Sequence, residues 1–149
     1  MNFQRIISDE SFHCFKDCYK DSCYTFMGSG LTWGYNRGFC EGCGGDLVSI
    51  ETEEEWNFIK RQIRNRRILE WYIGLKKMDG KWTWVSDKPL TISKWRENQP
   101  RKNSHVAFID RDFHAGDQGI STNLLGVAPK AYICEIPKGK TNLRLLSAK

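Results

Sequence analysis

The chain has 149 residues, of which 40% are hydrophobic and 13% aromatic, and its formal net charge is +5. This length and composition predict one folded domain with a single core and exclude an intrinsically disordered chain. No apolar run reaches the roughly 18 residues of a membrane helix, so we expect no membrane insertion by this segment. The charge is too modest to suggest a nucleic-acid partner.

Six cysteines in a chain of this length indicate an oxidising compartment and predict an extracellular protein. Their even number fits three disulfides but does not decide which cysteines pair. Four of them also have the spacing of a four-thiolate zinc site, which stays an alternative: Cys14, Cys18, Cys40 and Cys43. The first residues, Met1–Arg5, lack the long apolar segment of a secretory signal, so we expect an excised domain of a longer protein.

The first elements expected along the chain are a hairpin and a helix. They follow a segment over residues 1–13 that we expect to be flexible. Cysteines and aromatic residues from Cys14 to Phe26 predict a short hairpin whose second strand is Cys23–Phe26. The stretch Leu31–Cys43 places its larger residues at helical intervals, with Thr32 as the N-cap.

A second helix is expected after the short strand Asp46–Ile50. Thr52 followed by Glu55 has the spacing of a capping box, and the glutamates between them suit a first helical turn. Beyond this cap, apolar residues recur at three- and four-residue steps and predict one face toward the core: Trp56, Ile59 and Ile63.

The central part of the chain is rich in tryptophan and predicts a buried hairpin. Its strands are Trp71–Leu75 and Trp82–Asp87, with the turn at Met78–Gly80. Large aromatic side chains gain the most from burial, so we assign these tryptophans to the core and not to a sugar-stacking surface.

The C-terminal part is expected to alternate strands with irregular segments. Arg96–Ser104 reads as a loop, His105–Ile109 as a strand, and Asp110–Leu125 as irregular chain. Ala131–Ile136 is the last predicted strand, and residues 137–149 are expected to form a linker or tail.

In this order, the segments resemble the C-type lectin-like domain over 14–135. The resemblance rests on Cys23-Tyr24-Thr25-Phe26, Trp33, Phe39-Cys40, Gly44-Gly45-Asp46-Leu47-Val48-Ser49-Ile50, Glu53-Glu54-Glu55, Phe58-Ile59, Trp71-Tyr72-Ile73-Gly74-Leu75, Trp82-Thr83-Trp84, Pro89-Leu90, Trp95 and Tyr132-Ile133-Cys134-Glu135. Any one motif is weak, but the combination is highly specific. The segment from Val85 to Pro100 looks most like the lecticans and related matrix or cell-surface modules.

The resemblance implies an α+β fold over residues 14–136, in which two helices flank antiparallel sheets and a long loop region follows Trp84. It also implies a disulfide between Cys40 and Cys134, and, as in longer members, a second between Cys14 and Cys23. Cys18 and Cys43 are extra cysteines, and we expect them to pair with each other. The family's further bridge is missing, because Val106 and about Gly126 stand at its positions.

The resemblance also implies where calcium and sugar would bind. Gln99-Pro100-Arg101 stands at the family's Glu-Pro-Asn or Gln-Pro-Asp motif, in which Pro100 would keep a cis peptide bond. Arg101 replaces an oxygen ligand with a fixed positive charge and has no lone pair to offer. Near the expected Trp-Asn-Asp triplet, only Asp117 of Phe113–Asp117 can serve. Calcium prefers six to eight oxygen ligands and is therefore disfavoured here, although Gln99, Asn103 and Asp117 are its candidate ligands.

No motif in the chain indicates an enzyme. The three histidines have no serine, cysteine or carboxylate partner at a suggestive spacing: His13, His105 and His114. The aspartates from Asp110 to Asp117 lack the glycine and glutamate of an EF-hand loop. We therefore expect no catalytic residue and no cofactor.

The sequence thus predicts an extracellular recognition module, secreted or part of an ectodomain, that binds a cell-surface or matrix glycoprotein or an anionic glycan without calcium. The candidate ligand face is Arg96, Gln99, Arg101, Lys102, Asn103 and Asp117, and a candidate patch for anions is Arg64, Arg66 and Arg67. A calcium-dependent carbohydrate-binding lectin and a structural spacer of a larger receptor stay as alternatives.

Overall fold

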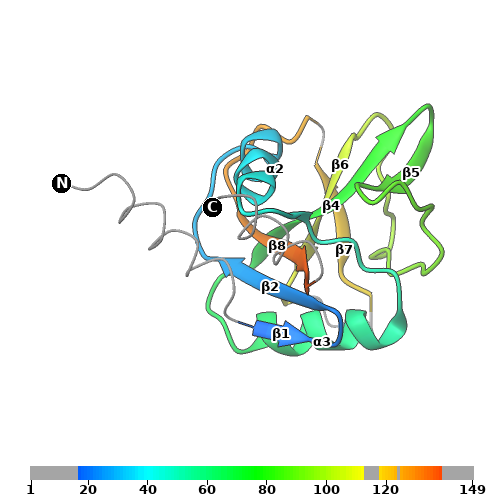
Figure 1. Cartoon of the computed structure of the whole chain (residues 1–149). Coiled ribbons are helices and arrows are strands. Elements are labelled where there is room, and N and C mark those ends of the chain that lie inside the picture. The colour runs from blue at the N-terminus through cyan, green and yellow to red at the C-terminus, as the bar shows by residue number, and fades with distance from the viewer. Residues whose placement is uncertain (1–16, 113–117, 124, 139–149) are drawn as a thin grey trace.

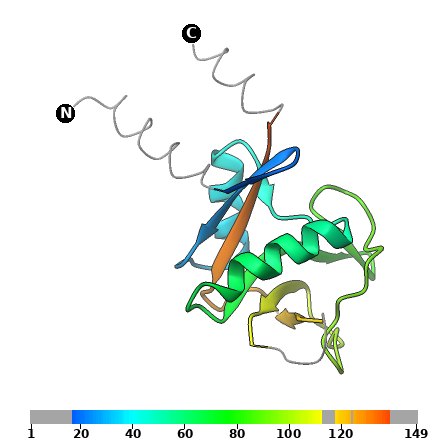
Figure 2. The same ribbon diagram turned by 90° about the horizontal axis from the view of Figure 1, so that it is seen from below.

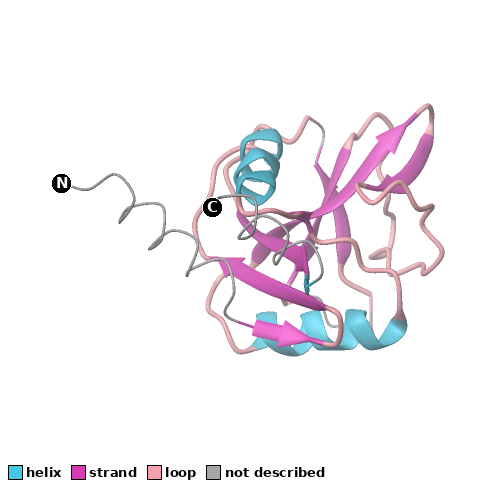
Figure 3. Ribbon diagram, in the orientation of Figure 1, coloured by secondary structure: helices cyan, strands magenta, loops and turns pink. Residues whose placement is uncertain are grey.

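The strongest prediction from the sequence, the strand at Trp71–Leu75, lies at the centre of a single eight-stranded sheet (Figures 1 and 3). The computed structural model describes residues 17–112, 118–123 and 125–138. The strands there are β1 (Asp17–Tyr19), β2 (Ser22–Met27), β3 (Asp46–Leu47), β4 (Glu70–Met78), β5 (Lys81–Trp84), β6 (Val106–Asp110), β7 (Ile120–Asn123) and β8 (Ala131–Pro137). The helices are α2 (Trp33–Gly42) and α3 (Glu53–Arg64). The predicted α+β fold is confirmed.

The sheet has the order β1-β2-β8-β4-β6-β7, with β3 paired to β8 and β5 to β4. Among the strands described, β4 and β8 alone pair in parallel, at Trp71↔Ala131 and Tyr72↔Tyr132. The first and last described strands, β1–β2 and β8, therefore lie side by side, with β8 between β2 and the central strand β4 (Figure 1). The predicted segment 1–13 and residues 139–149 of the predicted tail lie outside the described residues.

The central strand β4 is buried on both faces, which explains its continuous apolar sequence. Trp71, Ile73 and Leu75 pack in the larger core with α3, whereas Tyr72 packs in a second cluster with Cys40 of α2. Since successive side chains of a strand point to opposite faces, the two clusters lie on the two sides of the sheet. Figure 2 shows α3 across one of these faces.

Helix α3 begins where the sequence predicts, but its capping differs in one contact. The Thr52 hydroxyl accepts a hydrogen bond from the Glu55 amide at 3.1 Å. The Glu55 carboxylate accepts from the Glu51 amide at 3.3 Å, one residue before the N-cap amide that a regular capping box uses. The buried face of the helix is Trp56, Phe58, Ile59 and Ile63, so the predicted apolar face is confirmed with one residue added.

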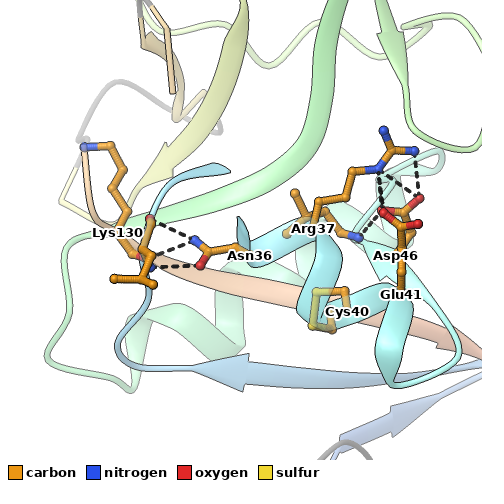
Figure 4. Close-up of a disulfide and its surroundings, with 9 residues drawn as sticks. Asn36, Arg37, Cys40, Glu41, Asp46 and Lys130 are labelled. Carbon is orange, nitrogen blue, oxygen red and sulfur yellow. Dashed lines mark hydrogen bonds and ion pairs between the residues drawn. A yellow bond between two sulfur atoms is a disulfide. The ribbon is translucent and has the colours of Figure 1, made fainter. Parts of the chain in front are cut away.

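Helix α2 is fastened to the sheet by one disulfide and two polar contacts (Figure 4). The bridge from Cys40 to Cys134 joins Cα atoms 5.3 Å apart, as the resemblance implies. On one side of the helix the Asn36 amide group donates to the carbonyl oxygens of Leu31 and Lys130. On the other side Arg37 forms a bidentate ion pair with Asp46, at 3.1 Å for the closest atoms. These contacts fix where the helix meets β3 and β8.

The β4–β5 hairpin turns at Asp79 and Gly80, whose φ angles of 49° and 77° are those of a two-residue type I′ turn. Further along β4, Gly74 passes so close to the preceding segment that a Cβ atom there would lie 2.6 Å from the Leu47 carbonyl oxygen. No other residue fits this crossing without displacing the backbone, so the glycine permits β4 to run beneath Leu47 and Val48.

Two of the three predicted disulfides are wrong. Cys18 bonds to Cys23, which contradicts both the Cys14–Cys23 and the Cys18–Cys43 pairings. The reason is local, because Cys18 and Cys23 are direct partners in the β1–β2 ladder with Cα atoms 3.9 Å apart. Cys43 is also disulfide-bonded, and Cys14 lies outside the described residues.

A second correction concerns the segment predicted to be irregular from Asp110 to Leu125. It contains strand β7, which pairs with β6 from Ile109↔Ile120 to Val106↔Asn123. The sequence Ile-Ser-Thr-Asn has a single large apolar residue and no period-two pattern, so it gives no strand signal. Its conformation comes from the ladder that β6 provides.

Candidate functional site

The long loop between β5 and β6 forms one side of the molecule and is attached to β7 (right-hand side of Figure 1). Trp95 pairs with Ile120 in an isolated bridge, and the Arg96 amide donates to the Ile120 carbonyl at 2.9 Å. Gly119 and Ile120 both donate their amides to the Lys94 carbonyl. The candidate ligand residues from Arg96 to Asn103 are therefore held against a strand that the sequence did not reveal.

Gln99 lies at the centre of this attachment. Its side-chain oxygen Oε1 accepts a hydrogen bond from the Thr122 amide at 3.1 Å and another from the Thr122 hydroxyl at 2.7 Å. The Gln99–Pro100 peptide bond is cis, as the resemblance implies. An amide oxygen has two lone pairs, so both are engaged by one residue of β7.

The residues that follow Gln99 present positive charge to solvent. The Arg101 amide donates to the Thr122 hydroxyl at 3.1 Å, and its carbonyl accepts from the Ser104 hydroxyl. The side chains of Arg101, Lys102 and Asn103 are exposed. Arg101 and Lys102 form no ion pair among the described residues, so this tip of the loop is a free cationic surface.

Arg96 and Asp110 form an ion pair with each other. The Arg96 guanidinium lies 3.4 Å from the Asp110 carboxylate, whose other oxygen accepts from the Asp112 amide at 3.0 Å. Arg96 therefore belongs to an ion pair at the base of the loop, whereas Arg101 lies at its exposed tip. The remaining candidate, Asp117, lies outside the described residues.

Thr122 and Asn123 are site residues that sequence reasoning missed. The later strand that faces Gln99-Pro100-Arg101 is β7, not the segment around Asp117. The Asn123 side-chain oxygen accepts from the Gly126 amide at 3.1 Å, and Gly126 packs on Val106, where the sequence analysis noted an absent bridge. The sequence around Thr122 and Asn123 gives no strand signal of its own, so their position follows from the pairing of β7 with β6.

The predicted anion patch at the end of α3 contains arginines with different environments. Arg64 and Arg67 are exposed. Arg66 pairs with Asp17 at 3.3 Å, donates to the Gln62 carbonyl at 2.8 Å, and lies 4.3 Å from the centre of the Phe26 ring. Arg66 thus fastens the helix end to β1 and β2.

A separate polar cluster lies between α3, β2 and β8. Burial, followed by the nearby Glu135 charge, raises the pKa of Glu55 to about 7, and burial also raises the pKa of Glu135. Glu135 accepts from the Ser22 hydroxyl and the Ser49 amide, while Glu51 binds the Ser86 hydroxyl and Lys88. Glu51 and Glu135 border a groove of about 300 Å³, and Glu55 borders a different one of about 500 Å³.

Neither region gathers three or more histidine, cysteine, aspartate or glutamate side chains in a geometry that holds a metal, within the part of the chain that the structure describes. None of the helices described there is long and apolar enough to cross a membrane.

Comparison with known proteins places this geometry in a family. The model of the lectin C-type domain matches residues 29–136. The chain belongs to the C-type lectin domain family. A mouse protein, C-type lectin domain family 4 member E, is 33% identical over 128 residues, which are 80% of this chain and 58% of that protein. The human C-type lectin domain family 10 member A is 31% identical over 128 residues, 83% of this chain and 40% of that protein.

Among solved structures, the Ca²⁺-independent C-type lectin SPL-2 from Saxidomus purpuratus superposes with a TM-score of 0.73 at 21% identity. The match covers 80% of this chain and 88% of that one, and at this identity it supports the fold alone. Members of the C-type lectin family are recognition domains, so the prediction of a non-enzymatic module is confirmed. This C-type lectin domain spans little more than half of its mouse relative.

Proposed function

We propose that this C-type lectin domain recognises an acidic surface of a cell-surface or matrix glycoprotein through the tip of its long loop, without calcium. The tip is formed by Arg101 and Lys102, with Gln99 and Thr122 as the support beneath. Guanidinium and ammonium groups that are exposed and unpaired attract carboxylate or sulfate groups, and Arg101 can bind either one in bidentate fashion.

The proposal that this domain binds its partner without calcium rests on the hydrogen bonding of Gln99. A calcium ion needs six to eight oxygen ligands, most of them anionic or carbonyl oxygens with a free lone pair. Here Gln99 accepts twice from Thr122, Asn123 accepts from Gly126, and Asp110 pairs with Arg96. The long-loop residues do not fit a calcium ion, and the fixed charge of Arg101 opposes one. SPL-2, whose fold this chain shares, is a Ca²⁺-independent C-type lectin, so the fold by itself does not require calcium.

A melting experiment separates this proposal from a calcium-dependent lectin. We expect the melting temperature to be the same in EDTA and in millimolar calcium, because nothing at the loop gains a ligand. Carboxylates also gather around Glu55, so the variants Gln99→Ala and Glu55→Gln distinguish the two regions. A calcium-induced rise that disappears in Gln99→Ala but persists in Glu55→Gln would overturn the proposal.

A binding experiment tests the acidic partner. We would probe an array of sialylated and sulfated glycans and glycoproteins with the wild type and with the double variant Arg101→Glu, Lys102→Glu. Binding in EDTA that the double variant loses would support the proposal. The control, Lys77→Glu with Lys81→Glu, changes net charge equally on the β4–β5 hairpin. Equal loss in both variants would show that net charge alone matters, and no binding by a folded wild type would favour a structural spacer.

We also propose an extracellular location, secreted or within a receptor ectodomain. Two disulfides, Cys18–Cys23 and Cys40–Cys134, persist only in an oxidising compartment. Growth in a reducing cytoplasm should therefore yield a protein without these bridges and with lower stability, which thiol titration of the purified protein checks.

A further inference from the structure

We infer that the C-terminal end of α3 is a second binding surface, separate from the long loop, for a linear sulfated glycan of the heparin class. The surface, which we call the α3-end surface, consists of Arg61, Arg64 and Arg67. All three side chains are exposed, and they lie within seven consecutive residues that contain no acidic residue. Arginine binds sulfate and carboxylate oxygens in a bidentate geometry that lysine does not reproduce.

The three arginines have no partner of their own within the described part of the chain. No ion pair or side-chain hydrogen bond involves Arg61, Arg64 or Arg67 there. Arg66, between them in sequence, is held by Asp17, Gln62 and the Phe26 ring. The arginines that can meet a ligand are therefore Arg61, Arg64 and Arg67, with Arg66 as the residue that fastens the helix end beneath them.

The acidic residues near this surface are neutralised by other bases. Asp17 pairs with Arg66, and Asp110 pairs with Arg96. Asp112 pairs with Arg111, and Glu70 pairs with Lys130 at 2.9 Å. Since each of these four carboxylates has a cation, the positive charge of the α3-end surface is uncompensated within the described part of the chain and attracts a polyanion.

Basic side chains also border the space between α3 and the end of β6. Lys60, Arg64 and Arg111 border one small cavity of about 10 Å³, whose floor includes Trp56 and Ile109. Such a volume holds about one water-sized group, so it cannot enclose a sugar ring. The surface is thus suited to a ligand that is recognised by charges along its length, as a sulfated glycan is, and not to a single buried monosaccharide.

Basic residues at a helix C-terminus have a structural explanation, because they interact favourably with the helix dipole. Arg61 and Arg64 lie in the last turn of α3 and gain from this effect. Arg67 lies beyond the C-cap residue Asn65, so the dipole does not account for its unpaired charge. A test must therefore measure binding and helix stability separately.

The experiment measures retention on immobilised heparin in a salt gradient. It also measures the Kd for soluble heparin at about 0.15 M ionic strength. The test variant is Arg61→Gln, Arg64→Gln, Arg67→Gln. Its matched control is Lys76→Gln, Lys77→Gln, Lys81→Gln on the β4–β5 hairpin, which lies away from α3 in Figure 1. Three neutralisations bring the net charge from +5 to +2 in both proteins.

We expect the α3-end variant to bind heparin roughly tenfold more weakly than the wild type, with a shallower dependence of log Kd on log salt. The hairpin variant should stay within about twofold of the wild type. Equal weakening of both variants, or no heparin binding by the wild type, would overturn the inference. These outcomes do not bear on Arg101 and Lys102, so the long-loop proposal stands or falls by its own test.

Two further measurements keep the result decisive. If the glutamine variant melts well below the wild type, the triple lysine variant Arg61→Lys, Arg64→Lys, Arg67→Lys takes its place. It preserves the charge but removes bidentate binding. That variant should still bind heparin several-fold more weakly. Vesicles of phosphatidylcholine with phosphatidylserine test for an anionic membrane instead. Vesicle binding that depends on the three arginines, without heparin binding, would replace the glycan with a lipid surface.

Discussion

The two sides of this C-type lectin domain are held together by different interactions. On the scaffold side, formed by α2, α3, β2, β4 and β8, burial of large side chains and the Cys40–Cys134 bridge dominate. On the long-loop side, residues 85–105 are attached to β7 mainly by hydrogen bonds between backbone and small polar side chains. The Trp71 side chain is buried and fills space in the core, whereas the Arg101 side chain extends into solvent.

This difference shows where such a domain can change without unfolding. Substitutions on the scaffold side remove buried contacts and cost several kcal/mol. Substitutions at the exposed loop tip cost little, because surface side chains away from special features contribute about 0.5 kcal/mol or less. An arginine in place of an oxygen ligand is therefore compatible with the same scaffold. Three variants test this contrast, from the largest expected effect to the smallest.

The largest effect is expected on removal of the Cys40–Cys134 bridge by the double variant Cys40→Ser, Cys134→Ser. The bridge closes a loop with a sequence separation of 94 residues, so the chain-entropy relation predicts a loss of about 4–5 kcal/mol. Urea denaturation measures this loss. The control, Cys18→Ser with Cys23→Ser, opens a separation of only 5 residues and should cost about 2 kcal/mol. Equal losses would contradict an entropic origin.

A smaller effect is expected from Glu55→Gln, which removes a charge from the scaffold side. Because burial raises the pKa of Glu55 to about 7 from an ordinary 4.5, the folded state holds its proton more tightly than the unfolded chain. The stability of the wild type should thus fall as pH rises through this window. The variant should be more stable than the wild type by about 1–2 kcal/mol at pH 8, after allowance for solvent screening, and similar at pH 4.5.

Thermal melting from pH 4 to pH 9 measures this crossover. The control is Glu54→Gln, an exposed neighbour whose ion pair with Lys20 lies at the surface. A wild type whose stability rises between pH 5 and pH 7, or a Glu54 variant with the same crossover, would contradict burial as the cause.

The smallest effect on global stability is expected from Gln99→Ala on the long-loop side. The variant removes the acceptor of two hydrogen bonds from Thr122, worth about 1 kcal/mol in total where water replaces the lost partner. Amide hydrogen exchange should be faster at Thr122 and unchanged in β4. Glu97→Ala, at an exposed neighbouring position, should leave the Thr122 amide protected. Faster exchange in β4 would show that the two sides are not independent.

The scaffold could be predicted closely because its signals are local. Thr32 and Thr52 cap the two helices as the sequence indicates, and the Trp71–Leu75 strand lies where its aromatic residues place it. The disulfides were harder, because Cys18 and Cys23 face each other through the register of a short hairpin that begins at Asp17. The family resemblance implied a bridge from Cys23 to Cys14, whereas the ladder pairs Cys23 with Cys18.

By itself the sequence determined the helices and the central strands, and the resemblance of its motifs to a known family implied the fold and the Cys40–Cys134 bridge. Each depends on apolar periodicity, capping residues or motifs that are continuous in the chain. Only the tertiary structure decided that Thr122 of β7 donates both hydrogen bonds to the Gln99 side-chain oxygen. It also decided that Arg66 is held while Arg61, Arg64 and Arg67 have no partner among the described residues. Those contacts join residues far apart in sequence. Their energies depend on which donor lies nearest in space, and no local pattern encodes that.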